Sequence, residues 1–589
     1  MIGRFLFFIL ILFSGLLLAK NIPEPLKISV TLSDLKPTDL HDMILSSLSI
    51  KSAENEERLN KERVELLAEL GQEEIIHGLE ALGYYRSKVS YKLIILSKTK
   101  MRAHYRVNKG PPTYIHTVDI RLMGEGSKHP LLSSILNHPI LLKGMQLNHQ
   151  SYEEYKEELL GEILQLGYLD ATFILKEIRI NTDRSKADIF LTLDTGKRYA
   201  FGVISFLNDR YPSSYLQRYV PFKSGEPYTT EKISNLYKGL WASDLFTRVR
   251  IYPETSEITD LSVPITVRLK NKALNTYTAG MGYGDETKLR GNLGWTHRLV
   301  RFPGHQINAN IRASKRRNRV NLLYTIPGLN PSTQQLLLET SATKEHFDHK
   351  YSRRFDNSIT QVTKFGKWEQ VLSIHYLKEK FREFNGDPTH HSQFLFPTVG
   401  YIWKNLKETV PFHHGFKIQM TSKVAFKKVL SSTDLLQAEV EPKWIILMGS
   451  CTRLILRGDF GATYTQNPKL LPLSLRFFAG GGDSVRGYKY DDLGPKERNV
   501  DGENVVVGGR YLLVGSVEIE RIILGDLSGA LFVDGGNAMN RLRDPLAVGA
   551  GFGVRWATPL GPFRLDIANP IKRQTKFRPQ FHLSFGIDL

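Results

Sequence analysis

The clearest indication of the fold is the stretch Phe581-His582-Leu583-Ser584-Phe585-Gly586-Ile587-Asp588-Leu589, at the C-terminal end of the chain. Large apolar residues alternate with small or polar ones at every second position. A period of two residues is typical of a β-strand that has one apolar face and one polar face. The alternation therefore predicts a strand that separates an apolar phase from water.

The same alternation recurs from about residue 275 onward, for example over 289–296 and 307–313. Tight connections alternate with long charged ones; the tight ones include 301–304, 525–528 and 559–562, and the long ones are 466–508 and 569–580. A soluble sandwich would show the same period. Strands of about ten residues and the asymmetry of the loops instead favour an all-β transmembrane barrel over 273–589. About 20 residues for each strand and its connection give about 16 antiparallel strands.

The composition of the chain excludes several classes of protein and of binding site. The 589 residues include 79 Lys and Arg against 60 Asp and Glu, a net charge of +19, and a single cysteine, Cys451. One cysteine excludes an intramolecular disulfide framework, a Cys-based zinc site and an iron–sulfur cluster. A mean hydropathy of −0.25 excludes a polytopic helical membrane protein. We interpret the positive charge as specific neither for nucleic acid nor for anionic lipid.

Residues 1–19 predict a signal peptide. Arg4 precedes an apolar stretch, 5–18, that is shorter than the roughly 20 residues a helix needs to cross a bilayer. Ala19 is the expected cleavage position, and an uncleaved N-terminal anchor is the alternative. The mature chain is expected to be exported without a helical anchor.

Between the signal peptide and the barrel, a unit of about 80 residues repeats. Gly83-Tyr84 and Gly167-Tyr168 each end a helical stretch and lie 84 residues apart. A weaker third copy runs over 240–269. Each copy predicts the order strand, helix, helix, strand, strand (βααββ), and the alternative is three unrelated α+β domains with similar turns.

The longest connection carries the most informative motif, Arg476-Phe-Phe-Ala-Gly-Gly-Gly-Asp-Ser-Val-Arg-Gly-Tyr488. Its glycine-rich turn presents one guanidinium, that of Arg486, followed by Gly487 and Tyr488. Downstream, Glu518 and Asp534 each lie on an alternating strand. A guanidinium can hold a carboxylate through two parallel hydrogen bonds. An exposed basic loop tip is the alternative reading of Arg486.

The Val-Arg-Gly-Tyr tip, the Phe-Val-Asp-Gly-Gly-Asn strand at 532–537 and the ending over 549–568 resemble the outer-membrane barrel assembly (bacterial surface antigen) superfamily, and within it the TamA branch. The resemblance implies periplasmic POTRA domains of βααββ order, here POTRA 1 at 20–110, POTRA 2 at 111–195 and POTRA 3 at 196–272. It also implies that the loop folds into the lumen, where Arg486 pairs with Asp534 and Glu518 lies beside them. The terminal Leu589 departs from the aromatic residue that usually ends the family's last strand.

The resemblance further implies a bacterial outer-membrane assembly factor that inserts or translocates client proteins of autotransporter type. A TamB-like, inner-membrane-anchored periplasmic subunit is the implied partner. A lateral seam between the first barrel strand, near Tyr277, and the last, near Phe585, would receive client strands by β-augmentation. A BamA-type factor, a two-partner secretion pore and a passive porin are the alternatives.

Other patterns predict no chemistry. The glycine run at 549–553 precedes no helix, so it is not a dinucleotide site. Histidines at 346, 349, 390–391 and 413–414 lack metal-site spacing, and we expect them in outer loops. The basic run 315–319 is expected to face anionic headgroups. No catalytic constellation, metal site or cofactor is predicted, and no nucleic-acid partner.

Overall fold

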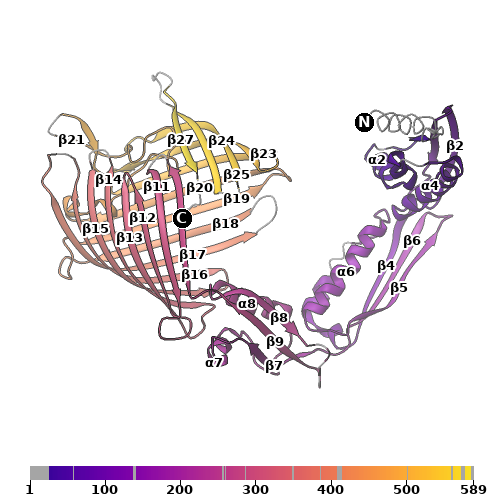
Figure 1. Cartoon of the computed structure of the whole chain (residues 1–589), viewed down its shortest axis with the longest axis horizontal. Coiled ribbons are helices and arrows are strands. Elements are labelled where there is room, and N and C mark those ends of the chain that lie inside the picture. Colours follow the sequence, from indigo (N-terminus) through magenta and orange to yellow (C-terminus); the bar gives the residue numbers. More distant parts are fainter. Residues whose placement is uncertain are drawn as a thin grey trace, which may run out of the picture. The chain divides into compact units, whose positions relative to one another are not determined.

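The computed structural model of the chain describes residues 26–585, except for 37, 57–58, 137–140, 255, 257, 259, 285–286, 348–349, 385, 408–413, 500–501, 559–560 and 572–577 (Figure 1). The predicted signal peptide and residues 586–589 lie outside the described part. Within that part, no helix has the length and apolar character needed to cross a membrane. Two compact units divide the chain, and the boundary between them runs through the third repeat.

Three small sheets with helices confirm the predicted βααββ order. The strand orders are β1-β3-β2, β4-β6-β5 and β7-β9-β8, so β2 and β5 are edge strands. The elements are β1 (Lys27–Ser33), α2 (Thr38–Ser47), α3 (Ser49–Ser52), α4 (Lys61–Ala81), β2 (Lys88–Ser97) and β3 (Lys100–Asn108); β4 (Tyr114–Met123), α5 (Pro130–Leu136), α6 (His149–Gln165), β5 (Thr172–Asn181) and β6 (Lys186–Asp194); β7 (Ala200–Leu207), α7 (Ser213–Leu216), α8 (Thr230–Ala242), β8 (Phe246–Pro253) and β9 (Ser262–Asn271).

The long helix of each of the first two repeats forms because one face is apolar and an asparagine caps its start. In α6, Tyr155, Leu159 and Ile163 are buried on one face, as the periodicity predicts. The Asn148 side chain accepts a hydrogen bond from the Gln150 N–H at 2.8 Å. Each of the two repeats therefore has its own closed apolar core.

The Gly-Tyr pairs of the repeats form a recurring junction with the next repeat. Gly83 and Gly167 follow α4 and α6 with φ of 89° and 96°, a conformation that favours glycine. Their carbonyls accept hydrogen bonds from the N–H groups of Thr113 and Tyr199, each at 2.8 Å. In the third copy, Asp244 takes the glycine's place after α8, with φ of 60°.

Asp244 adds an ionic contact to this junction. Its carboxylate pairs with Lys272 and with Arg298, whose Nη2 lies 2.5 Å from Oδ2. Arg298 is 4 % exposed and also donates to the Ala273 carbonyl and to the Thr276 hydroxyl at 2.6 Å. Arg298 thus ties Asp244 to the first residues of the barrel.

Asp244→Gly should loosen this junction, because glycine keeps the backbone conformation but removes the carboxylate. We expect hydrogen exchange over 240–246 to become roughly tenfold faster, corresponding to about 1.4 kcal/mol for a half-exposed charged contact. Burial alone would raise the pKa of Asp244, but hydrogen bonds from Lys272 and Arg298 outweigh it and hold the pKa below its usual value. The contact should therefore persist at every pH above about 4 and weaken only below it. Exchange rates that are equal in wild type and variant at pH 7 would contradict this.

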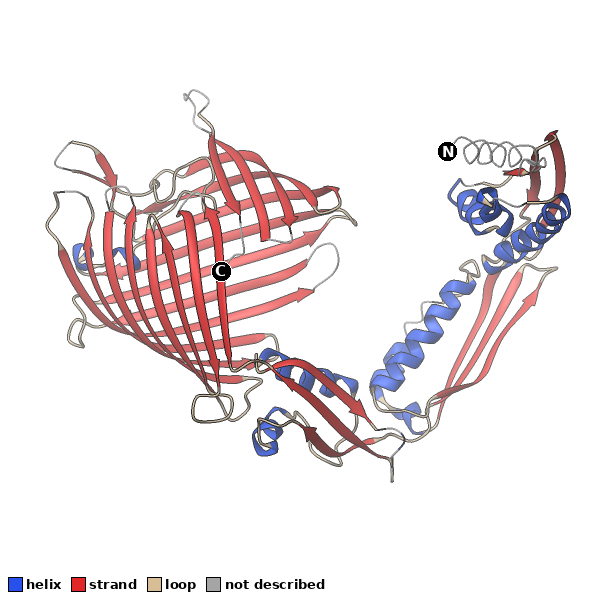
Figure 2. Ribbon diagram, in the orientation of Figure 1, coloured by secondary structure: helices blue, strands red, loops and turns tan. Residues whose placement is uncertain are grey.

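The C-terminal part is a closed barrel of 16 strands, as predicted (Figure 2). Consecutive strands pair antiparallel around the wall. The strands are β10 (Asn275–Gly284), β11 (Lys288–Arg298), β12 (Gln306–Ser314), β13 (Arg317–Pro327), β14 (Gln334–Phe347), β15 (Lys350–Phe365), β16 (Trp368–Arg382), β17 (His390–Lys407), β18 (His414–Ala425), β19 (Leu435–Leu447), β20 (Thr452–Thr465), β23 (Tyr511–Leu524), β24 (Leu527–Met539), β25 (Ala547–Thr558), β26 (Gly561–Pro570) and β27 (Gln580–Phe585). Strands β14 to β17 have 14 to 18 residues and so exceed the expected ten.

The end of the barrel at which β10 begins is called the proximal end, and the opposite end is called the distal end. Proximal turns contact the third repeat: the Arg218 guanidinium donates to the Pro327 carbonyl at 3.3 Å, and Gln306 donates to the Ser243 carbonyl at 2.8 Å. His414 begins β18 at the proximal end, so the expectation that it lies in an outer loop is wrong. The described histidines at 346, 390 and 391 lie at the distal ends of β14 and β17.

Candidate functional site

The connection between β20 and β23, residues 466–510, enters the barrel and is called the lumen loop. It includes the short hairpin β21 (Lys496–Arg498) and β22 (Asn504–Val506). Its apolar residues Phe477, Val485 and Tyr488 pack against Leu512 and Val514 of the wall strand β23. The loop is therefore part of the barrel's interior packing.

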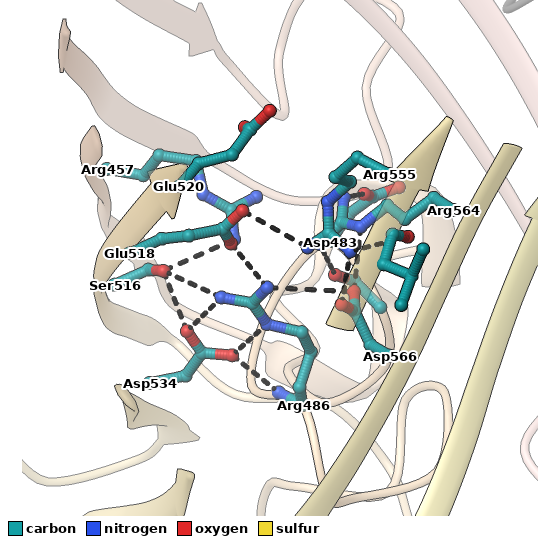
Figure 3. A network of polar contacts seen from close by, with 12 residues as sticks. Arg457, Asp483, Arg486, Ser516, Glu518, Glu520, Asp534, Arg555, Arg564 and Asp566 are labelled. Atoms are coloured by element: carbon teal, nitrogen blue, oxygen red, sulfur yellow. Dashed lines mark hydrogen bonds and ion pairs between the residues drawn. The ribbon is translucent and has the colours of Figure 1, made fainter. Parts of the chain in front are cut away.

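Arg486 lies at the tip of the lumen loop and is fully buried (Figure 3). Its Nε and Nη2 donate to the two oxygens of Asp534 at 2.6 and 2.8 Å, and its backbone N–H donates to the same carboxylate at 3.0 Å. Nη1 donates to Glu518 at 2.5 Å. The guanidinium carbon lies 3.3 Å from the centre of the Phe532 ring. We call Arg486, Asp534 and Glu518 the loop lock.

The wall strands position the two acids that bind the loop. Asp534 lies on β24 opposite Ser516 of β23, and the Ser516 hydroxyl donates to Asp534 at 2.7 Å. Glu518 lies two residues further along β23, so its side chain points to the same face. Both acids are at most 5 % exposed. A carboxylate that is buried away from water is costly unless a cation pairs with it. Arg486 is therefore held by its ion pairs as well as by packing.

A second set of charged side chains surrounds Arg486 (Figure 3). The sequence did not predict that they contact the loop lock. Asp566 of β26 lies 3.6 Å from Arg486 and accepts from Arg564 at 2.7 Å. Arg555 of β25 bridges Asp566 at 2.6 Å and Glu518 at 3.1 Å. These residues lie in the motif over 549–568 that carried the family resemblance. The alternation of the sequence predicts that Arg564 and Asp566 lie on one face of their strand. Their position next to Arg486 depends on the register between strands.

The residues that follow Arg486 dock on the last strands. The Gly487 N–H donates to Nε2 of His582 on β27 at 3.1 Å, and the Tyr488 hydroxyl donates to the Val548 carbonyl at 3.4 Å. Gly487 has φ of 94°, which favours glycine. A Cβ atom at Gly549 would lie 1.9 Å from the Arg486 carbonyl, so this wall glycine makes room for the loop tip.

The other side of the lumen loop contacts the opposite wall. Arg476 pairs with Glu383 at 2.7 Å, next to β16, and the Ser474 hydroxyl donates to Glu379 at 2.5 Å. Asp491 lies 3.8 Å from Lys350 of β15. The loop thus reaches across the lumen and is held at both walls.

Part of the basic run 315–319 also lies in the lumen. Arg317 pairs with Glu345 and Arg319 with Glu339, each at 2.8 Å. Both arginines line an interior cavity of about 310 Å³, and Arg319 also lines one of about 450 Å³. The expectation that these two residues face lipid headgroups is therefore wrong. Both lie at the alternate positions of β13 whose side chains point into the lumen.

The seam joins β10 to β27. Among the described residues, Tyr283 pairs with Phe585 and Gly284 with Ser584, whereas all ten residues of β10 pair with β11 on its other side. Tyr277 is on the seam strand as expected, but the structure does not bring it to Phe585. It lies six residues from Tyr283, about 20 Å along the strand.

Comparisons with known proteins agree with this architecture. Residues 280–588 match the Omp85 superfamily domain, and residues 30–109 match the first POTRA domain of TamA. The chain is 22% identical over 494 residues to the outer membrane protein assembly factor BamA of Neisseria meningitidis, covering 71% of this chain and 60% of that protein. It is 35% identical over 123 residues to the chloroplastic outer envelope protein 80 of Arabidopsis thaliana, covering 19% of this chain and 14% of that protein.

Among solved structures, BamA from Haemophilus ducreyi lacking POTRA domains 1–3 is similar, with a TM-score of 0.58 and 20% identity. The match covers 80% of this chain and 99% of that one, and it supports the shared fold. The matches span less than two thirds of the length of these curated relatives.

Proposed function

The chain belongs to the Omp85 superfamily, and we propose that it inserts or translocates client proteins of autotransporter type into the bacterial outer membrane. It is an outer-membrane β-barrel protein with its N-terminal repeats in the periplasm, so the proximal end of the barrel is the periplasmic end. The observation that carries the proposal is the seam. It is the place where the first strand, β10, meets the last, β27, with Tyr283 opposite Phe585 and with the tip of the lumen loop bound to β27 through Gly487 and His582.

The position of the seam supports a strand-exchange mechanism. All ten residues of β10 pair with β11 on one side, and the other side of β10 meets the last strand, β27. When β10 and β27 separate, the edge of β10 offers backbone N–H and C=O groups to an incoming strand, and main-chain hydrogen bonds supply the affinity. A client strand could add to β10 at this edge without covalent chemistry.

The loop lock is proposed to hold the resting state. Arg486 binds β23 and β24, while the adjacent Gly487 binds His582 of β27, the last strand, which meets β10 at the seam. The loop tip therefore connects the last strand to the rest of the wall. Release of the lock would free β27 and favour seam opening.

Reconstitution tests the function directly. Liposomes that contain the purified protein should convert an unfolded autotransporter barrel to its heat-resistant folded form faster than empty liposomes do. Equal acceleration of an unrelated porin would favour the BamA-type alternative, and no acceleration of either client would contradict the proposal.

The periplasmic repeats are proposed to bind a TamB-like subunit through their sheet edges. Ile95 on the edge strand β2 is 69% exposed, and Ile174 on the edge strand β5 is 59% exposed. The fragment 20–270 should fold alone with mixed α/β circular dichroism and should retain this subunit from envelope extracts. Ile95→Lys and Ile174→Lys should weaken retention about tenfold by blocking edge pairing. Full retention by a folded fragment that carries both substitutions would contradict binding at the edges.

A further inference from the structure

A row of four cationic side chains and one histidine crosses the outward face of β14 to β17 near their distal ends. Strand register places Lys344 opposite Arg353, Arg353 opposite Lys380, and Lys380 opposite His391. Lys378 lies two residues below Lys380 on the same face. The side chains of all five are exposed, and a groove of about 890 Å³ runs along them. We call these five residues the cation row.

The cation row has no acidic counterpart on its own face. The acidic residues of these strands, among them Glu339, Glu345 and Glu379, have the opposite parity and point into the lumen. Within the described part of the chain, no ion pair involves any of the five. Like charges directly opposite on neighbouring strands destabilise a sheet. An anion from outside the chain would therefore stabilise a row of this kind.

The height of the row on the barrel wall indicates which phase holds the anion. At the proximal end, Trp368 of β16 lies opposite Trp403 of β17, in the manner of an interfacial aromatic girdle. Twelve residues separate Trp368 from Lys380, or about 40 Å along the strand. At a tilt of about 40°, this is about 30 Å of height, slightly more than the apolar band of about 25 Å in an outer-membrane barrel.

The residues between the girdle and the row are apolar or uncharged. On β16 they include Leu372, Ile374 and Tyr376, and on β17 they include Leu395 and Val399. The cation row thus lies at the distal boundary between hydrocarbon and headgroups. Because the proximal end is periplasmic, this is the outer leaflet.

We infer that the cation row binds the phosphate groups of an outer-leaflet glycolipid of lipid A type. From Lys344 to His391 the row spans three interstrand spacings, about 14 Å, so it can meet more than one phosphate of a single headgroup. Phe355 lies in the same groove and offers an apolar contact for an acyl chain. The bound lipid would cover the wall of β14 to β17, which is a different part of the barrel from the seam.

Native mass spectrometry of the full-length protein in detergent tests this inference, with bisphosphorylated lipid A as the probe. Wild type should bind it more tightly than monophosphorylated lipid A or phosphatidylglycerol. The variant Arg353→Gln/Lys380→Gln should bind at least tenfold more weakly. The control Lys367→Gln/Lys404→Gln, which removes the same charge at the proximal ends of these strands, should bind like wild type.

Each other result would overturn the inference. Equal binding of phosphatidylglycerol would show a general preference for anions, and equal loss in the control would show an effect of net charge alone. Binding by Arg353→Gln/Lys380→Gln at the wild-type level would show that the row is not the site. Heat-modifiable gel mobility verifies that each variant is a folded barrel.

Discussion

Arg486→Ala is expected to release the lumen loop and to lower client insertion while leaving the barrel folded. The substitution removes the partner of two buried carboxylates, Asp534 and Glu518. Breaking a fully buried pair costs about 3–5 kcal/mol. Arg555 remains beside Glu518 and lumen water reduces the cost, so we expect about 2–3 kcal/mol, which is roughly a 30- to 150-fold larger open population of the loop.

Protease cleavage within 466–510 measures loop release, and heat-modifiable gel mobility verifies the barrel. Arg453→Gln is the matched control, because Arg453 pairs with Glu520 at 2.7 Å between two wall strands and this pair does not involve the loop. Arg486→Lys should rescue only in part, since an ammonium group cannot form the two parallel hydrogen bonds to Asp534. Wild-type protease resistance and client insertion in Arg486→Ala would show that the lock has no role.

The double exchange Arg486→Asp with Asp534→Arg should recover little. At the loop tip, the new aspartate would face Glu518, and Asp566 lies 3.6 Å from the present guanidinium. These two acids would repel it, and the nearby Arg555 and Arg564 already pair with them, so the new arginine at position 534 would be its main partner. Substantial recovery would mean that these charges are better hydrated than their burial indicates.

Tyr283→Cys with Phe585→Cys, in a Cys451→Ser background, should form a disulfide across the seam and abolish client insertion. The two residues are directly opposite on antiparallel strands, where Cβ atoms are about 4.5–5.5 Å apart, close to disulfide geometry. A covalent bond between the first and last strands of the wall should prevent strand exchange, so the client folding rate should fall to that of empty liposomes. A reductant should restore it.

Tyr277→Cys with Phe585→Cys is the matched control, because about 20 Å along β10 separates Tyr277 from the residue opposite Phe585. This pair should remain reduced and active. Undiminished client insertion by protein in which the 283–585 disulfide has formed completely would contradict the seam mechanism.

The classes of structure and the faces of the elements could be predicted from the sequence. Alternation with a period of two predicted the barrel and about 16 strands, since an apolar outside and a wet inside require it. The two Gly-Tyr pairs and a weaker third copy predicted three βααββ units, because a helix that ends in a tight turn needs a residue with positive φ. In the third unit, Asp244 adopts that conformation, which explains why the third copy is weak in sequence.

Which residues lie opposite one another on neighbouring strands could be seen only in the tertiary structure. A shift of two residues in register leaves every side chain on the same face, so alternation cannot distinguish Tyr277 from Tyr283 as the neighbour of Phe585. For the same reason, neither the contacts of Asp566 and Arg555 with the loop lock nor the alignment of Lys344, Arg353, Lys380 and His391 could be predicted. Register in a closed barrel depends on the stagger of all its strands together, and no single stretch of sequence contains that information.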